Sequence, residues 1–186
     1  MSGMIINVHG LASSGDNSKY AWIRDNVTDH EIYSPTFDYE HALPRDILDN
    51  ISGVARDADY ALGSSLGGFF AALLNRIYPH IKAILINPAF VPFLSLGSME
   101  GLPLEMCRRY HELFGLYYYD SLDSYYERGG ADNLHVLLGG RDELLRHDVV
   151  TKPLLPKGCH IYEIEEGSHR LGFTPEVNDI LRSIIK

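Results

Sequence analysis

The sequence is poor in cysteine and in positive charge. Its two cysteines, Cys107 and Cys159, lie in different segments without the spacing of a metal site, so we expect neither a disulfide framework nor a bound metal. Lysine and arginine number 16 against 25 acidic residues, which gives a formal net charge of -9. Nucleic acids and anionic membrane surfaces bind clustered cationic faces. The composition therefore argues against both as main partners and favours a neutral or apolar small molecule.

The sequence also lacks a long hydrophobic run. No apolar stretch approaches the roughly 18 residues that suggest a membrane span, so we expect no integral membrane association. The opening residues, MSGMIINV, have no cationic start followed by a long apolar segment, unlike a secretory signal. A cytoplasmic protein is the resulting expectation. With 186 residues, of which 45% are hydrophobic, the chain is expected to fold as one domain over residues 1–186.

Short apolar runs alternate with segments of helical periodicity along the chain. The expected strands are Met4–Val8, Glu31–Ser34, Asp59–Leu62, Ala83–Ile86, Leu134–Leu138 and Ile161–Ile164. The expected helices are Leu43–Arg56, Ser65–Tyr78 and Thr174–Ile185, the last with Thr174 as its cap and Pro175 in its first turn. This alternation needs crossover connections, which predict an α/β fold with a mostly parallel sheet flanked by helices.

A G-x-S-x-G pattern at residues 63–67 gives the first indication of chemistry. It stands between an expected strand and an expected helix, where Gly63 and Gly67 allow the tight turn that carries a nucleophile. Ser65 is therefore the candidate nucleophile. Ser64 is a poorer candidate because Leu66 would then stand where the second glycine belongs. The alternative interpretation is a glycine-rich turn that only packs tightly.

A serine nucleophile needs a base and an acid, which follow it along the chain in α/β folds that carry a serine triad. His169 is the candidate base because it alone among the later histidines occupies a Gly/Ser loop after the last expected strand. Asp142 is the candidate acid, since it follows an expected strand and a glycine turn. A helix N-cap is the other role open to Asp142, and Glu143 and Asp148 are the substitutes for the acid.

An oxyanion hole completes the predicted site. One donor is expected to be the backbone N–H of Leu66, directly after the nucleophile. The other is expected in the loop after the first strand, at Leu11, with Ala12 as the alternative. His9 is interpreted as a structural residue that holds this loop and takes no part in proton transfer.

Five motifs taken together resemble the small YqiA-type bacterial esterases, a compact branch of the α/β-hydrolases. They are HGLASS at 9–14, GSSLGGFFAALL at 63–74, INPA at 86–89, LLGGRDELL at 137–145 and EEGSHRLGF at 165–173. The resemblance covers most of the chain. It implies a triad of Ser65, Asp142 and His169, carboxylic ester or thioester substrates, and no cofactor.

The sequence departs from this family near the expected acyl site. Leu11 stands where relatives commonly carry an aromatic residue, and Arg170 and Leu171 follow the histidine where relatives often carry a small or aromatic one. These departures bear on the choice of substrate. Because the first expected strand begins almost at the first residue, we expect a minimal α/β-hydrolase fold without an opening antiparallel hairpin, with about six strands in the order 2-1-3-4-5-6.

Residues 88–130 interrupt the alternation and hold more aromatic side chains than a crossover helix needs. We expect a small aromatic-rich cap insertion here, in which Phe90, Phe93 and Phe114 are candidate substrate-binding residues for an acyl chain. The alternative is that these rings only pack on the core.

The whole sequence predicts a serine esterase that cleaves carboxylic ester bonds in a small molecule through a Ser-His-Asp triad and an acyl-enzyme intermediate. A thioesterase or another acyl hydrolase would use the same residues. A catalytically silent hydrolase fold that serves as a binding protein is the alternative from a different class. A homo-oligomer is compatible with each of these functions.

Overall fold

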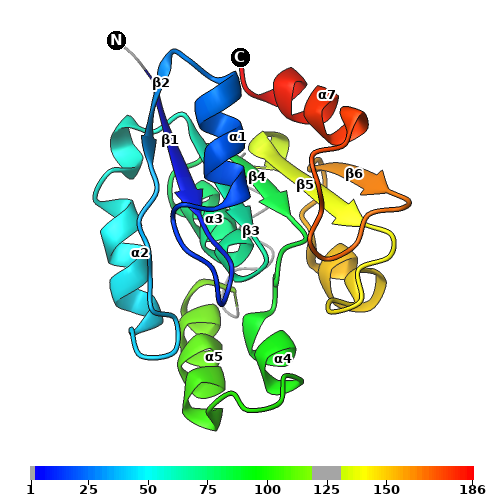
Figure 1. The fold of residues 1–186 in the computed structure, drawn as a ribbon. Helices are drawn as coiled ribbons and strands as arrows, with labels where there is room; N and C mark the ends of the chain where they lie inside the picture. The colour runs from blue at the N-terminus through cyan, green and yellow to red at the C-terminus, as the bar shows by residue number, and fades with distance from the viewer. Residues whose placement is uncertain (1–2, 119–130) are drawn as a thin grey trace.

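The computed structural model describes residues 3–118 and 131–186, which form a six-stranded sheet with helices on both faces (Figure 1). The strands are β1 (Gly3–Val8), β2 (His30–Tyr33), β3 (Tyr60–Ser64), β4 (Lys82–Ile86), β5 (Leu134–Gly139) and β6 (His160–Ile164). Their order is β2-β1-β3-β4-β5-β6, and every neighbouring pair runs parallel. The predicted fold class and strand order are confirmed.

Apolar side chains cover both faces of the sheet, as a parallel sheet with helices on each side requires. Successive strand residues point to opposite faces, so Ile5 belongs to one hydrophobic cluster and Ile6 to the other. Helices α2 (Pro44–Ser52), α3 (Leu66–Ile77) and α5 (Leu104–Tyr118) contribute to the cluster that contains Ile6. Helices α1 (Ser18–Asn26) and α7 (Pro175–Ile184) contribute to the cluster that contains Ile5.

Local capping explains where the last helix begins. Thr174 Oγ1 accepts a hydrogen bond from the backbone N–H of Val177, and Pro175 occupies the first turn of α7, as predicted. Among the helices of residues 3–118 and 131–186, none combines the length and the apolar character needed to cross a membrane.

Two helices differ from the prediction. The helix expected over Leu43–Arg56 ends at Ser52, before Gly53, and Ala55–Asp57 form a separate 3₁₀ turn. Gly53 favours this end because glycine loses more backbone entropy in a helix than other residues do. Helix α1 was not expected at all. Its buried residues are Trp22 and Ile23, too few apolar positions to reveal a helical period in the sequence.

The segment after β4 contains α4 (Pro92–Gly97) and α5, which lie together at one end of the molecule in Figure 1. Helix α5 packs on α3, since the rings of Tyr110 and Phe114 lie 6.3 and 6.4 Å from that of Phe69. The rest of the predicted insertion, residues 119–130, lies outside the described residues.

The carboxyl ends of five strands lie level at one edge of the sheet. In the strand register Val8 pairs with Gly63, Ser64 with Ile86, and Gly139 with Ile164, while Ile86 also pairs with Leu137. The loops that follow β1, β3, β4, β5 and β6 therefore meet at this edge. It is the edge at which open α/β sheets bind ligands.

Candidate active site

Ser65 occupies a sharp turn between β3 and α3. Its backbone has φ 50° and ψ -120°, a conformation that non-glycine residues rarely adopt outside strained functional turns. The neighbouring glycines make this turn possible. A Cβ at Gly63 would collide with the carbonyl oxygen of Gly67, and a Cβ at Gly67 would collide with that of Val8. The G-x-S-x-G pattern thus reflects backbone packing that only glycine permits, and it holds Ser65 at the edge of the sheet.

The loop after β6 brings His169 to Ser65. The Nε2 atom of His169 lies 3.2 Å from Ser65 Oγ, and its Nδ1 atom lies 2.9 Å from Asp142 Oδ2 and 3.1 Å from Oδ1. A carboxylate only accepts, so Nδ1 carries the proton and Nε2 is left to accept the hydroxyl proton of Ser65. The three side chains therefore form a connected hydrogen-bond chain in the order needed for a nucleophile, a base and an orienting acid.

Asp142 accepts hydrogen bonds from the His169 ring and from the backbone that follows it, but it does not cap a helix, because the next helical turn begins only at His147. Its side chain is 1% exposed, and Oδ1 accepts hydrogen bonds from the backbone N–H groups of Leu144 and Leu145 while the carboxylate also faces His169. Burial by itself raises the pKa of Asp142. Hydrogen bonds from His147, His169 and the two backbone N–H groups outweigh burial and hold this pKa well below its ordinary value. Asp142 is accordingly charged at neutral pH.

The two substitute acids lie in other positions. One carboxylate oxygen of Glu143 accepts a hydrogen bond from the backbone N–H of His169 at 3.0 Å, so it contacts the loop and not the imidazole. Asp148 forms an exposed ion pair with Lys152 at 2.7 Å. The geometry therefore favours Asp142 over both substitutes.

The loop after β1 lies directly against the nucleophile. A Cβ built at Gly10 would stand 3.2 Å from Ser65 Cβ, so the backbone of this loop approaches Ser65 closely. Ala12, in the same loop, has a φ of 55°, so the chain turns sharply at this residue. Among the described residues, no group accepts a hydrogen bond from the backbone N–H of Leu11 or of Leu66. Their role as oxyanion donors stays a prediction.

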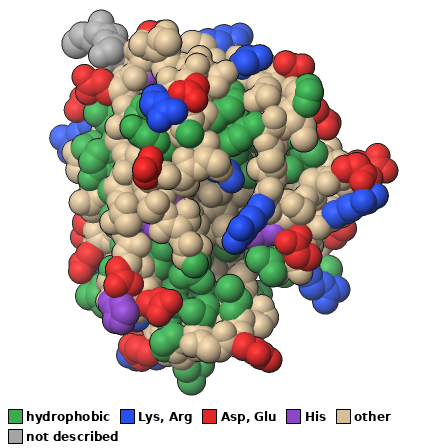
Figure 2. Space-filling model, viewed as in Figure 1, with side chains coloured by type: hydrophobic (Ala, Val, Ile, Leu, Met, Phe, Trp, Pro, Cys, Tyr) green, Lys and Arg blue, Asp and Glu red, His purple; other side chains and the backbone are tan. Residues whose placement is uncertain are grey.

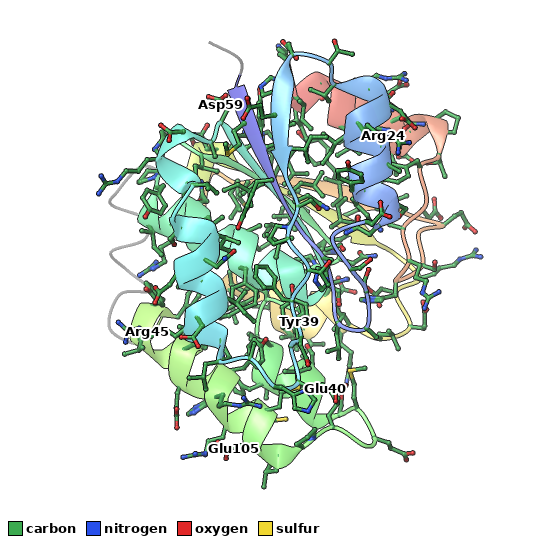
Figure 3. All side chains as sticks on the ribbon, turned by 60° about the vertical axis from the view of Figure 1, so that its left-hand side comes forward. Arg24, Tyr39, Glu40, Arg45, Asp59 and Glu105 are labelled. Atoms are coloured by element: carbon green, nitrogen blue, oxygen red, sulfur yellow. The ribbon has the colours of Figure 1, made fainter. Side chains whose placement is uncertain are left out.

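His9 holds this loop in place. It is fully buried, its Nε2 accepts the backbone N–H of Phe37 at 2.8 Å, and its Nδ1 lies 2.8 Å from the carbonyl of Gly10. Nδ1 therefore carries the proton. The hydroxyl of Tyr39, labelled in Figure 3, donates to the His9 carbonyl at 2.6 Å. Burial lowers the pKa of His9, which keeps the ring neutral, as its accepting Nε2 requires.

A cleft of about 640 Å³ opens beside Ser65 and His169. Its walls come from the loop after β1 and the first turn of α1 (residues 10–14 and 16–19) and from residues 170–173, and Figure 2 shows a hollow on this face. Leu11, Arg170 and Leu171, the positions that depart from the YqiA-type pattern, all line it. Within residues 3–118 and 131–186, no three His, Cys, Asp or Glu side chains gather closely enough to hold a metal ion.

The three phenylalanines predicted to bind an acyl chain do not line this cleft. Phe93 and Phe114 pack edge to face at 5.4 Å against the core, and Phe90 lines a separate pocket of about 180 Å³ with Leu94 and Leu145. The geometry of the described residues favours the alternative, in which these rings pack on the core. Their role in substrate binding stays a prediction.

The sequence profile of an uncharacterised protein family, UPF0227, matches residues 4–181 of the chain. The chain belongs to UPF0227. The resemblance to YqiA-type esterases is thereby confirmed at the level of the family. A comparison with curated protein sequences gives no match.

Solved structures share the fold of this UPF0227 chain. Est1E from Butyrivibrio proteoclasticus superposes with a TM-score of 0.66 at 19% identity, covering 99% of this chain and 89% of that one. The monoacylglycerol lipase of Paleococcus ferrophilus gives 0.60 at 18% identity, covering 98% and 92%. Mouse alpha/beta hydrolase domain-containing protein 10 gives 0.64 at 13% identity, covering 99% and 88%. At these identities the likeness shows the α/β-hydrolase fold and leaves the substrate open.

Asn87 belongs to the candidate active site of this UPF0227 chain, although the sequence predicted no role for it. It follows β4, is 1% exposed and has a φ of 42°. Its Oδ1 accepts the backbone N–H of Gly139 at 2.6 Å, and its Nδ2 donates to the carbonyls of Ser168 and His169 at 2.9 and 3.0 Å. Asn87 thus ties the end of β5 to the loop that carries the base. A polar residue directly after an apolar strand, in the INPA motif, was the signal for it.

His147 is the second residue without an earlier role. Its Nε2 lies 2.9 Å from Asp142 Oδ2, its Nδ1 lies 3.0 Å from Thr151 Oγ1, and its side chain is 6% exposed. Facing a carboxylate, Nε2 must donate, so His147 supplies a second imidazole donor to Asp142. The sequence does not predict this contact, because irregular backbone joins Asp142 to His147 and their spacing matches no helix or strand period.

Proposed function

We propose that this chain is a serine hydrolase that cleaves carboxylic esters, with Ser65 as nucleophile, His169 as base and Asp142 as the orienting acid. The observation that carries the proposal is the unbroken chain from Ser65 Oγ through the His169 ring to Asp142, with Ser65 in a strained turn at the edge of the sheet. The esterase and lipase names of the structural neighbours agree with this class of reaction.

In the acylation step, Ser65 Oγ attacks the ester carbonyl carbon while its proton passes to His169 Nε2. Asp142 holds the Nδ1–H and stabilises the imidazolium as it forms. The backbone N–H groups of Leu11 and Leu66 donate to the oxygen that becomes negative, and each such donor is typically worth about 3 kcal/mol. The imidazolium then protonates the leaving alcohol, and the acyl group stays on Ser65.

Water completes the cycle. It loses a proton to His169 Nε2 and attacks the acyl carbonyl, and the same two N–H groups receive the oxyanion. The proton returns to Ser65 Oγ as the carboxylic acid leaves. No step needs a group beyond these residues and water.

Labelling with a fluorophosphonate followed by peptide mapping tests the nucleophile, since the reagent reacts with an activated serine. We expect the label on Ser65. Ser65→Ala should lower kcat for p-nitrophenyl butyrate by about 10⁴- to 10⁶-fold and leave the fold intact. Ser64→Ala is the matched control and should be much milder. If Ser65→Ala keeps more than about a tenth of the wild-type rate, the nucleophile is another group.

A second pair of variants tests the acid. Asp142→Asn should lower kcat by roughly 10³- to 10⁴-fold, because the wrong imidazole tautomer faces Ser65 and the imidazolium loses its partner. Asp148→Asn is the control and should change little. The opposite order of effects would move the acid to Asp148.

The same triad would also cleave thioesters or amides. Oxygen-ester, thioester and amide substrates that share one acyl group therefore test which type of bond the protein cleaves. We expect the oxygen ester to be hydrolysed. Absence of hydrolysis of all three, with an unlabelled Ser65, would instead support a silent fold that acts as a binding protein.

A further inference from the structure

Two cationic side chains line the cleft that holds Ser65. Lys19 lies in the first turn of α1, and Arg170 directly follows His169 in the loop after β6. They reach the cleft from the two segments that form its walls. Figure 2 shows Lys or Arg side chains at the border of the hollow on this face. Positive charge therefore gathers beside the nucleophile of a chain whose net charge is -9.

Neither cation has a countercharge among the residues that the structure describes. In the described part of the chain, neither Lys19 nor Arg170 forms an ion pair or a side-chain hydrogen bond. Asp16 is the one acidic residue among those that line the cleft, and it is exposed. Other cations of this protein find carboxylates, as Arg141 does with Glu166 at 2.6 Å. The pair in the cleft is thus available to an external anion.

Lys19 is held in position by aromatic packing. Its Nζ lies 6.0 Å from the centre of the Phe173 ring, and that ring stacks on Trp22 at 5.8 Å. Burial lowers the pKa of Lys19, and repulsion from the charge of Arg170 lowers it further, so the two cations are close enough to sense each other. Arg170 is exposed and Lys19 is half-buried, and an anion between them would offset the repulsion that each exerts on the other.

We infer that Lys19 and Arg170 bind an anionic group, a carboxylate or a phosphate, that the ester substrate itself carries. The inference rests on the proposed function, since it places the anion in the same cleft as the scissile ester. It also refines the expectation of a neutral or apolar substrate that the net charge suggested. A group in contact with two cations is affected more by them than by negative charges spread over the rest of the protein. Charges more than about 10 Å away are largely screened at ordinary ionic strength.

Matched substrates measure this selectivity. On the acyl side, p-nitrophenyl hexanoate is compared with the p-nitrophenyl monoester of adipate, which adds a carboxylate to a six-carbon chain. On the alcohol side, 1-butyrylglycerol is compared with 1-butyrylglycerol 3-phosphate. We expect the anionic member of one pair to have a kcat/KM at least about tenfold higher, the effect of one charge-assisted hydrogen bond. The pair that responds identifies the side of the ester that carries the anion.

Substitutions then assign the effect to the two cations. Lys19→Met keeps the apolar stem against Phe173 and removes the charge, and Arg170→Met removes the other charge. Each should lower the ratio of kcat/KM between the anionic and neutral members by about threefold, and the double variant should bring it near one. Arg24→Met, on the same helix and paired with Asp25 on the surface, is the matched control and should keep the wild-type ratio (Figure 3).

The outcomes separate this inference from the proposed function. Neutral esters hydrolysed through Ser65, with no preference for an anion in either pair, would overturn the anion site alone. A preference that survives in the Lys19 and Arg170 double variant would do the same. Hydrolysis that persists in Ser65→Ala, or absence of hydrolysis of all four esters, would overturn the proposed function together with the inference.

Discussion

Replacing Asn87 tests how the fold holds His169, the proposed base. In Asn87→Ala the buried N–H of Gly139 loses its acceptor, which costs about 2 kcal/mol of unfolding free energy. The carbonyls of Ser168 and His169 lose a donor, but Ser168 is exposed and water can replace part of this, so about 1 kcal/mol is lost there. Alanine is also strained at a φ of 42°, by about 1 kcal/mol. We expect Asn87→Ala to lose about 4 kcal/mol in total.

Asn87→Gly separates the two causes. Glycine removes the same hydrogen bonds but adopts a positive φ freely, so this variant should be about 1 kcal/mol more stable than Asn87→Ala. Urea unfolding measures both differences, followed by the fluorescence of Trp22, the single tryptophan of the chain.

The kinetic effect distinguishes positioning from stability. Without the Nδ2 bonds, the His169 loop is free to move away from Ser65, and a displacement of about 1 Å can lower the rate by about 10²-fold. We expect kcat for p-nitrophenyl butyrate to fall by that amount in both variants at a temperature where they stay folded. A loss of less than about 1 kcal/mol in Asn87→Gly, with an unchanged kcat, would refute the role of Asn87 as an anchor of the loop.

Three further variants have expected outcomes. His147→Phe removes a donor from the buried carboxylate of Asp142, so it should cost about 1.5–3 kcal/mol of unfolding free energy. The less neutralised carboxylate then holds the His169 imidazolium more strongly, so the acid limb of the profile of kcat/KM against pH should move to higher pH. If this limb does not move, the role of His147 is structural only. Burial, with repulsion from His160 and Lys82, lowers the pKa of His135 to about 4, so the unfolded chain binds the extra proton below about pH 6.5 and stability falls from there to pH 4. In His135→Phe the unfolding free energy, measured with urea, should lose this pH dependence, which amounts to at most about 3 kcal/mol between pH 6.5 and pH 4. An equal dependence of the unfolding free energy on pH in both proteins would contradict the lowered pKa of His135. Phe114→Ala should cost about 3–5 kcal/mol by urea unfolding and leave the acyl-chain-length profile of p-nitrophenyl esters unchanged, whereas an altered profile would restore Phe114 as a substrate-binding residue.

Local patterns were sufficient to predict the sheet and the turn that carries Ser65. Strand order follows from alternating elements and right-handed crossovers, and the strained turn requires glycine at fixed offsets from the serine. Asp142 and His169 could be predicted because each follows a strand whose carboxyl end shares one edge of the sheet. These features need only sequence neighbours and the rules of parallel sheets.

Contacts between distant segments were beyond prediction. Asn87 binds groups 52 to 82 positions away, and nothing local to the INPA motif names those partners. The phenylalanines of α4 and α5 show the same limit, since hydrophobicity predicts that a ring is buried but not whether it faces the core or a cleft. Lys19 lines the cleft because of α1, a helix with too little apolar periodicity to be recognised.

The sequence separation within the triad has a consequence for how activity emerges. Ser65 and His169 are 104 positions apart, and their contact needs β6 to be paired beside β5 at the far side of the sheet from β1. On a ribosome, the turn that carries Ser65 emerges well before His169 does, so a nascent chain that ends at β5 lacks the proposed base. Recovery of hydrolysis during refolding would therefore report that the loop after β6 has reached Ser65, whereas helical circular dichroism reports the formation of the helices.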